Sequence, residues 1–170
     1  MKQKRLLYDK QTLLSYSHLI ISKLYNHPEY IKSHLIGVYV SLPLEVYTLQ
    51  FIETALKTKR VAVPKVIGKT MEFYEIQSLD DLKEGYFHVL EPISNHYVKP
   101  ENIDLMITPL LAYDSFYYRV GYGKGYYDRY FNSGFKGYKI GLAYDFSYVD
   151  KINIDQYDIA LDDIITNATL

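Results

Sequence analysis

The chain has 170 residues, of which 19 are Lys or Arg and 20 are Asp or Glu, so its net charge is −1. This balance provides no basic face for a nucleic-acid backbone, and no apolar run approaches the roughly 20 residues that span a bilayer. The absence of cysteine excludes disulfides, thiolate nucleophiles and cysteine-ligated metals. We expect one domain over residues 1–170 and a cytoplasmic protein, because a polar mixture follows the basic start where a secretory signal would be apolar.

The first part of the chain alternates helical and strand patterns. Apolar residues recur at spacings of three and four over residues 8–25 and predict a helix, which Pro28 ends because proline disfavours helix in the residue before it. Short apolar runs at 35–40 and 60–64 predict buried strands, with a second helix at 46–58 between them. A strand, a helix and a strand in this order predict a βαβ unit, and so a parallel sheet.

The second part of the chain adds further strands. We expect them at residues 71–76, 103–108 and 138–143, with 164–165 as a last edge piece. Another helix is expected to begin near Tyr126, and the sequence contains no internal repeat and no interdomain linker. The predicted fold class is α/β: a three-layer α/β/α sandwich in which helices flank a mostly parallel, mixed sheet.

Three alternating glycines stand in the segment R-V-G-Y-G-K-G-Y-Y-D-R, which runs from Arg119 to Arg129. Glycine has no Cβ and tolerates positive φ, so backbone N–H groups of such a loop can turn inward onto an anion. Lys124 adds a point charge, and the two arginines can form forked hydrogen bonds to phosphate oxygens. A helix that begins near Tyr126 would add a favourable dipole. Together these features predict a polyphosphate ligand.

The common glycine motifs do not account for this segment. A P-loop has Ser or Thr after its lysine, where this chain has Gly125, and the spacing of the dinucleotide fingerprint is not met. An RNA-recognition strand is broken by Tyr127 and Asp128. The plain alternative is a glycine-rich surface turn, which three glycines alone would favour; the charged residues around them shift the balance to polyphosphate.

Carboxylates near this loop are candidates for a magnesium site, because Mg²⁺ accompanies polyphosphates and takes one or two carboxylates. Asp128 follows Gly125 by three residues. An acidic group near the C-terminus has the usual features of a solvated surface when taken alone, and it consists of Asp158, Asp162 and Asp163. Glu45 follows the 35–40 strand, where open α/β sheets bind ligands, although a first-turn helix residue would look the same.

The segment from Arg119 to Arg129 resembles the signature of the 5-formyltetrahydrofolate cyclo-ligase family, also called methenyltetrahydrofolate synthetases. Every fixed position of the family pattern R-x-G-x-G-x-G-Y-Y-D-R is met. Other segments resemble further family elements in the same order, and they lie at residues 45–48, 90–92, 104–109, 112–114, 141–145 and 157–166. The resemblance covers about residues 10–167.

This resemblance implies an ATP- and Mg²⁺-dependent ring closure of 5-formyltetrahydrofolate to 5,10-methenyltetrahydrofolate, with release of ADP and phosphate. The formyl oxygen is a poor leaving group, so ATP first phosphorylates it; a neighbouring folate nitrogen then attacks the activated carbon, and phosphate departs. Positioning and charge neutralisation carry most of such a phosphoryl transfer.

The resemblance also implies roles for individual residues. The ATP site would consist of Arg119, Gly121, Tyr122, Gly123, Lys124, Gly125, Tyr126, Tyr127 and Asp128. The folate site would consist of Val40, Glu45, Tyr122, Gly123, Lys124, Gly125 and Tyr126. The catalytic residues would be Lys124, Arg119 and Tyr126, with Lys124 neutralising the migrating phosphoryl group. Asp128 and Asp162 would serve Mg²⁺, and the Glu45 carboxylate would accept hydrogen bonds from the pterin.

The chain departs from the family pattern in a few places. The family opens with a helix whose Lys-x-x-x-Arg element contacts ATP, whereas Met1 aligns inside or just after that helix and Lys4-Arg5 have a different spacing. Other differences from common family residues are Ser147, Asn153 and Tyr157.

Two alternatives to the cyclo-ligase remain at this stage. One is a non-catalytic relative that binds folate or nucleotide but lacks the N-terminal basic ATP element. The other is an RNA- or nucleotide-binding module that uses tyrosine stacking, which the near-neutral charge disfavours. For the cyclo-ligase we expect a monomer whose partners are 5-formyltetrahydrofolate and ATP, not a nucleic acid or a membrane.

Overall fold

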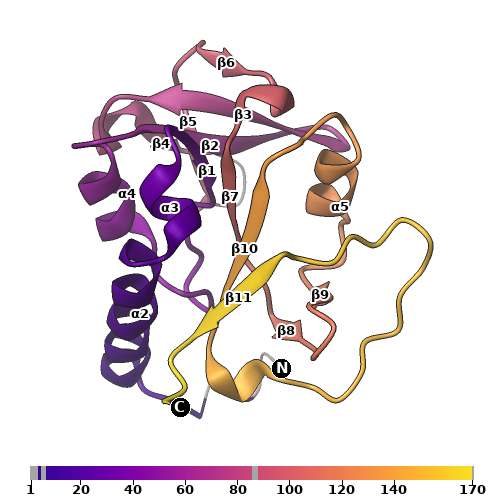
Figure 1. Cartoon of the computed structure of the whole chain (residues 1–170). Coiled ribbons are helices and arrows are strands. Elements are labelled where there is room, and N and C mark those ends of the chain that lie inside the picture. Colours follow the sequence, from indigo (N-terminus) through magenta and orange to yellow (C-terminus); the bar gives the residue numbers. More distant parts are fainter. Residues whose placement is uncertain (1–3, 5–6, 86–87, 170) are drawn as a thin grey trace.

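A central sheet of seven strands organises the computed structural model, which describes residues 4, 7–85 and 88–169 (Figure 1). In sheet order the strands are β11 (Asp163–Thr166), β10 (Tyr138–Ala143), β7 (Leu105–Thr108), β1 (Leu35–Val38), β2 (Arg60–Ile67), β3 (Thr70–Ile76) and β6 (Tyr97–Val98). The five from β11 to β2 are parallel, and β3 and β6 continue the sheet antiparallel. The predicted mixed, mostly parallel sheet is confirmed.

Helices cover both faces of this sheet (Figure 1). They are α2 (Lys10–Tyr25), α3 (Pro28–Lys32), α4 (Leu49–Ala55) and α5 (Tyr126–Phe131), with 3₁₀ turns η1 (Leu79–Asp81), η3 (Pro100–Asn102) and η4 (Asp145–Ser147). Side chains that alternate along the strands enter two separate cores, as a pleated strand requires. Ile36 and Val38 pack on the side of α2 and α4, whereas Leu35 packs in the cluster that contains residues of α5. The three-layer α/β/α prediction is therefore confirmed.

The first helix shows how local sequence sets an element. Asp9 caps α2 by accepting the Thr12 N–H at 2.7 Å, so the helix begins at Lys10, two residues later than predicted. Leu13, Ile20 and Leu24 are buried on its inner face. Among the described residues no helix is both long and apolar enough to cross a membrane.

Two further elements differ from their predicted bounds for a visible reason. The helix predicted at 46–58 forms only over Leu49–Ala55. It starts late because the Thr48 hydroxyl donates to the Tyr39 carbonyl (2.8 Å) and accepts the Ser41 N–H (3.0 Å), which holds the preceding segment as a loop. Strand β2 continues past Pro64, since only β3 pairs with it there and the missing N–H can face the open side.

Two small sheets have no counterpart in the predictions. One pairs β4 (Leu82–Glu84) with β5 (Leu90–Pro92), and the other pairs β8 (Ala112–Tyr113) with β9 (Arg119–Val120). The second matters for function, because it lies between the carboxyl end of β7 and the glycines of the segment 119–129.

Candidate active site

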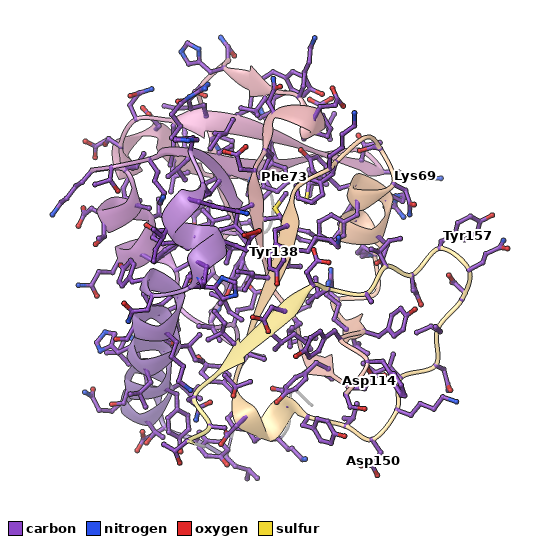
Figure 2. The ribbon with its side chains drawn as sticks, in the orientation of Figure 1. Lys69, Phe73, Asp114, Tyr138, Asp150 and Tyr157 are labelled. Carbon is purple, nitrogen blue, oxygen red and sulfur yellow. The ribbon has the colours of Figure 1, made fainter. Side chains whose placement is uncertain are left out.

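Three loops meet at the carboxyl edge of the parallel strands, the usual place for ligands in open α/β sheets. They follow β1, β7 and β10 and comprise residues 39–48, 109–125 and 144–162. The buried Asp114 ties the second loop to the third: one carboxylate oxygen accepts the N–H groups of Phe116 (3.0 Å) and Tyr118 (3.1 Å), and the other accepts that of Ile152 (3.0 Å). Figure 2 shows Asp114 beside the long segment that leads to β11.

The glycine loop, residues 121–125, leaves β9 and enters α5 directly. Gly123 and Gly125 have φ values of 84° and 67°, the left-handed region that the sequence predicted glycine to supply. Gly121 is needed for a different reason, since an added Cβ would lie 2.7 Å from the Arg119 Nη1 atom. Lys124 is exposed on this loop, and α5 begins at Tyr126 as predicted.

Arg119 joins the glycine loop to the other predicted site residues. Its guanidinium carbon lies 5.1 Å from the centroid of the Tyr127 ring, and its buried Nε has no hydrogen-bond partner within the described parts of the chain. Burial lowers the pKa of this arginine, while the charges of Asp128 and Glu45 act in the opposite direction. A buried donor without a partner is costly unless a ligand completes it, and an anion is the ligand that suits it.

The two tyrosines after Gly125 have different surroundings. Tyr127 is buried beneath Arg119 and beside Phe131, with ring centroids 6.0 Å apart, and burial raises the pKa of its hydroxyl. Tyr126 is half-buried, and its hydroxyl donates to the Gly68 carbonyl at 3.4 Å. The side chain of Tyr127 therefore supports the loop from below, which leaves its predicted contact with ATP to the backbone.

Asp128 lies on α5 with one oxygen engaged, because its Oδ1 accepts the Ile159 N–H at 3.1 Å. Burial raises the pKa of the Asp128 carboxyl, and the neighbouring carboxylates of Asp158 and Asp155 raise it further, against the effects of the Ile159 bond and of Arg119. Its other oxygen has no hydrogen-bond partner among the described residues, so this carboxylate has room for a cation bound to phosphate.

Asp162, the second predicted metal residue, is engaged elsewhere. Its Oδ2 accepts the Lys139 N–H at 2.8 Å and pairs with Lys139 Nζ at 3.1 Å, beside the first residues of β10 and β11. Within residues 4, 7–85 and 88–169, no group of three or more His, Asp or Glu is arranged to hold a metal ion. A magnesium site that combines Asp128 and Asp162 stays a prediction.

Glu45 lies in a tight turn before α4, not in a helix. Its side chain is 4% exposed, its Oε1 accepts the Leu42 N–H at 2.8 Å, and its carbonyl accepts the Tyr144 hydroxyl at 3.1 Å. Val40 is buried at the start of the same loop. The structure thus brings Glu45 within the electrostatic reach of Arg119, although 74 residues separate them in the chain.

Sequence reasoning missed the side chains that support this turn. Ser17 of α2 is buried, lies 3.1 Å from the Tyr144 hydroxyl and accepts the Tyr47 N–H at 3.1 Å. A serine within an otherwise apolar helix face was the available signal. At the N-terminus, Lys4 is exposed, whereas Arg5 of the predicted basic pair lies outside the described residues.

A groove of about 450 Å³ lies at the opposite, amino edge of the sheet. Its lining includes Lys32, His34, Glu101, Asp104 and Lys136, none of which the sequence predicted as a site residue. The groove is separate from the three loops, and the convergence of predicted residues on those loops identifies the candidate site.

Comparison with known proteins identifies the family of the chain. The model of the 5-formyltetrahydrofolate cyclo-ligase family matches residues 1–167. A 5-formyltetrahydrofolate cyclo-ligase of Mycoplasma genitalium is 47% identical over 76 residues, 44% of this chain and less than half (46%) of that protein. The protein of the same name from Escherichia coli (strain K12) is 28% identical over 153 residues, 85% of this chain and 84% of that protein.

Solved structures agree as well. The NMR structure of Aquifex aeolicus 5,10-methenyltetrahydrofolate synthetase has a TM-score of 0.89 at 33% identity, and the match covers 99% of this chain and 86% of that one. The 5,10-methenyltetrahydrofolate synthetase of Mycoplasma pneumoniae has a TM-score of 0.79 at 27% identity, with 98% and 94% covered. Because the family model covers almost the whole chain, the chain belongs to the 5-formyltetrahydrofolate cyclo-ligase family, whose members named above are ligases.

Proposed function

We propose that this chain catalyses the ATP- and Mg²⁺-dependent cyclisation of 5-formyltetrahydrofolate to 5,10-methenyltetrahydrofolate, with release of ADP and phosphate. The observation that carries the proposal is the partly exposed Arg119, whose buried Nε has no hydrogen-bond partner among the described residues and whose guanidinium lies against the glycine loop. The charges of Asp128 and Glu45 both act on this guanidinium. A cation that interacts with a carboxylate suited to a metal and with one suited to a pterin matches a phosphoryl transfer from ATP to a folate.

The chemistry places few covalent demands on the protein. The formyl oxygen attacks the γ-phosphorus of ATP, and ADP leaves. The adjacent folate nitrogen then attacks the activated carbon and gives up its proton, and phosphate is expelled with the former formyl oxygen. Lys124 neutralises the charge of the migrating phosphoryl group, because it is the exposed cation of the loop. Arg119 orients the phosphates, Tyr126 borders the reacting groups, and Glu45 accepts hydrogen bonds from the pterin.

Bound Mg²⁺ would supply charge neutralisation at the phosphate oxygens. Asp128 fits that role, because one oxygen of its half-buried carboxylate is held by Ile159 and the other is available. Asp162 would have to exchange its Lys139 contacts before it could reach the same ion, so we assign the metal to Asp128 first. We also propose that residues 1–170 act as a single domain and as a monomer.

The test mixes protein, MgATP and 5-formyltetrahydrofolate and follows the methenyl product by its near-ultraviolet absorbance, with ADP measured in parallel. Product and ADP in equal amounts, and neither without ATP, are expected. A folded protein that binds MgATP and folate by calorimetry but forms no product would instead identify the non-catalytic relative. Tight, salt-sensitive binding of an oligonucleotide would favour the RNA-binding alternative.

A further inference from the structure

Arg129, the last residue of the glycine segment, makes its polar contact away from the site. Its Nη2 donates to the Lys69 carbonyl at 2.8 Å, and its guanidinium carbon lies 5.2 Å from the centroid of the Tyr126 ring. Lys69 belongs to the short turn between β2 and β3, and Figure 2 shows it beside α5. An arginine expected to bind phosphate is therefore bonded to a turn that lies 60 residues earlier in the chain.

The same turn receives a second bond from the start of α5. The Tyr126 hydroxyl donates to the Gly68 carbonyl. Two consecutive carbonyls of the β2–β3 turn thus accept hydrogen bonds from two side chains of α5. Arg129 also lies against the end of the loop: an added Cβ on Gly125 would be 3.0 Å from its Nη1. The Arg129 side chain thus connects Gly125, the Tyr126 ring and the β2–β3 turn.

The hydrophobic contacts of α5 hold this helix independently of Arg129. Tyr127, Tyr130 and Phe131 are buried, and the Tyr130 ring packs on Phe73 of β3 at a centroid distance of 4.9 Å. Arg129 itself is exposed. What its contacts add is a restraint on the junction between the glycine loop and the helix, where Gly125 has a positive φ.

We propose that Arg129 is a positioning residue, which fastens the junction of Gly125 and Tyr126 to the β2–β3 turn and so holds the glycine loop in its binding conformation before ATP arrives. The inference rests on the proposed function. A loop that binds only in one conformation loses apparent affinity in proportion to the fraction of time spent in others. Loss of the restraint therefore raises KM for MgATP and leaves kcat at saturation nearly unchanged.

The experiment compares three variants with the wild type. Arg129→Gln removes the guanidinium, and Arg129→Lys keeps the charge and N–H donors but loses the planar fork. A turn-lengthened variant with two glycines inserted between Lys69 and Thr70 displaces both carbonyls while Arg129 is kept. The matched control is Arg60→Gln, an exposed arginine that bonds Glu75 across the same two strands at 2.7 Å, at the end away from the turn. The melting temperature, kcat, and KM for each substrate are measured for all of them.

We expect KM for MgATP to rise about tenfold in Arg129→Gln and in the turn-lengthened variant, with kcat within about twofold of wild type. Arg129→Lys should fall between wild type and Arg129→Gln. Combining Arg129→Gln with the longer turn should add nothing to the effect of the longer turn alone, because the longer turn already removes the Arg129 contact together with the Tyr126 contact. Arg60→Gln should change the melting temperature only.

Other results would overturn the proposal. If Arg129→Gln raises KM but the longer turn does not, Arg129 contacts the nucleotide directly. If KM stays unchanged in both while the melting temperature falls as in Arg60→Gln, the bond is structural only. An inactive wild type would refute the proposed function instead, and the dissociation constant of MgATP, measured by calorimetry, would then test the restraint on its own. If Arg129→Gln does not fold, the turn-lengthened variant supplies the comparison.

Discussion

Lys124 lies on the glycine loop and Arg119 lies just before it on β9, and the surroundings of these two cations differ. Arg119 is enclosed by Tyr127 and by the backbone of Gly121, whereas Lys124 is exposed. Substitution of Lys124 should therefore affect the reaction without affecting folding, and the two consequences can be measured separately.

We predict that Lys124→Ala lowers kcat/KM by about 10²-fold or more, the usual effect of removing one charge that stabilises a transferring phosphoryl group. The melting temperature should not change, because the side chain is exposed. Lys136→Ala, at an exposed lysine of the groove on the opposite edge, is the control and should retain full activity. An unchanged rate in Lys124→Ala would show that the loop has been assigned wrongly.

Asp128 carries a conflict between stability and function. Burial raises the pKa of its carboxyl above the ordinary value. A raised folded-state pKa means that the folded protein holds the proton more tightly than the unfolded chain. The protonated carboxyl therefore favours the folded state at low pH. This contribution to stability is lost as the pH rises through the folded-state pKa and the carboxyl ionises.

Asp128→Asn should accordingly raise the melting temperature near neutral pH by about 1–2 °C, since the amide oxygen can still accept the Ile159 N–H. The difference from wild type should shrink as the pH falls and the wild-type carboxyl gains its proton. Turnover should fall about 10²-fold, because the proposed magnesium site would lose its ligand. Asp150→Asn, at an exposed aspartate of the loop that contains Ile159, is the matched control. A less stable Asp128→Asn protein at neutral pH would contradict this view.

At the scale of elements, Asp114 links two loops. It lies in the loop that leads to the glycine segment, and it bonds to Ile152 of the loop that follows β10. We predict that Asp114→Ala lowers the free energy of unfolding by about 3 kcal/mol, because three N–H groups in part-buried bonds lose a charged acceptor. Asp114→Asn should have an intermediate effect, since one amide oxygen can serve Phe116 and Tyr118 but the NH₂ group would face the Ile152 N–H. Urea unfolding measures both, and equal stabilities for the two variants would argue against this geometry.

The elements predicted best are those whose bounds depend on the residues within the element itself. Strand β10 was predicted to the residue from its mostly apolar run. Strands β8 and β9 were missed, since two residues show no periodicity. The start of the 46–58 helix was predicted too early, because the bonds of Thr48 to Tyr39 and Ser41 follow from the path of the loop and have no local signature.

The candidate site divides in the same way. The positive φ of Gly123 and Gly125 follows from residue type, and sequence predicted it. The proximity of Glu45 to Arg119 depends on β1 lying beside β7, an adjacency set by the packing of the whole sheet. Likewise, the bond between Arg129 and the Lys69 carbonyl requires the β2–β3 turn to reach α5, which no motif encodes.

At the scale of the whole molecule, ligand binding should be visible as stability. MgATP at a concentration of 100 times its dissociation constant should raise the free energy of unfolding by about 2.7 kcal/mol. Removal of Mg²⁺ with a chelator should abolish product formation, and added Mg²⁺ should restore it. ATP that stabilises the protein equally with and without Mg²⁺ would argue against Asp128 as a metal residue.

Helix α5 spans the distance between two parts of the chain that share no strand pairing. Arg129 reaches the β2–β3 turn on one side, and Asp128 reaches the backbone of Ile159 on the other. The glycine loop leads directly into this helix. Immobilising the loop should therefore reduce the motion of both contacts, that of Arg129 with Lys69 and that of Asp128 with Ile159. In hydrogen–deuterium exchange, MgATP should slow the amides of residues 67–70 and 155–160 together, although neither segment belongs to the proposed ATP site. Protection confined to the glycine loop would show that the helix does not transmit the effect.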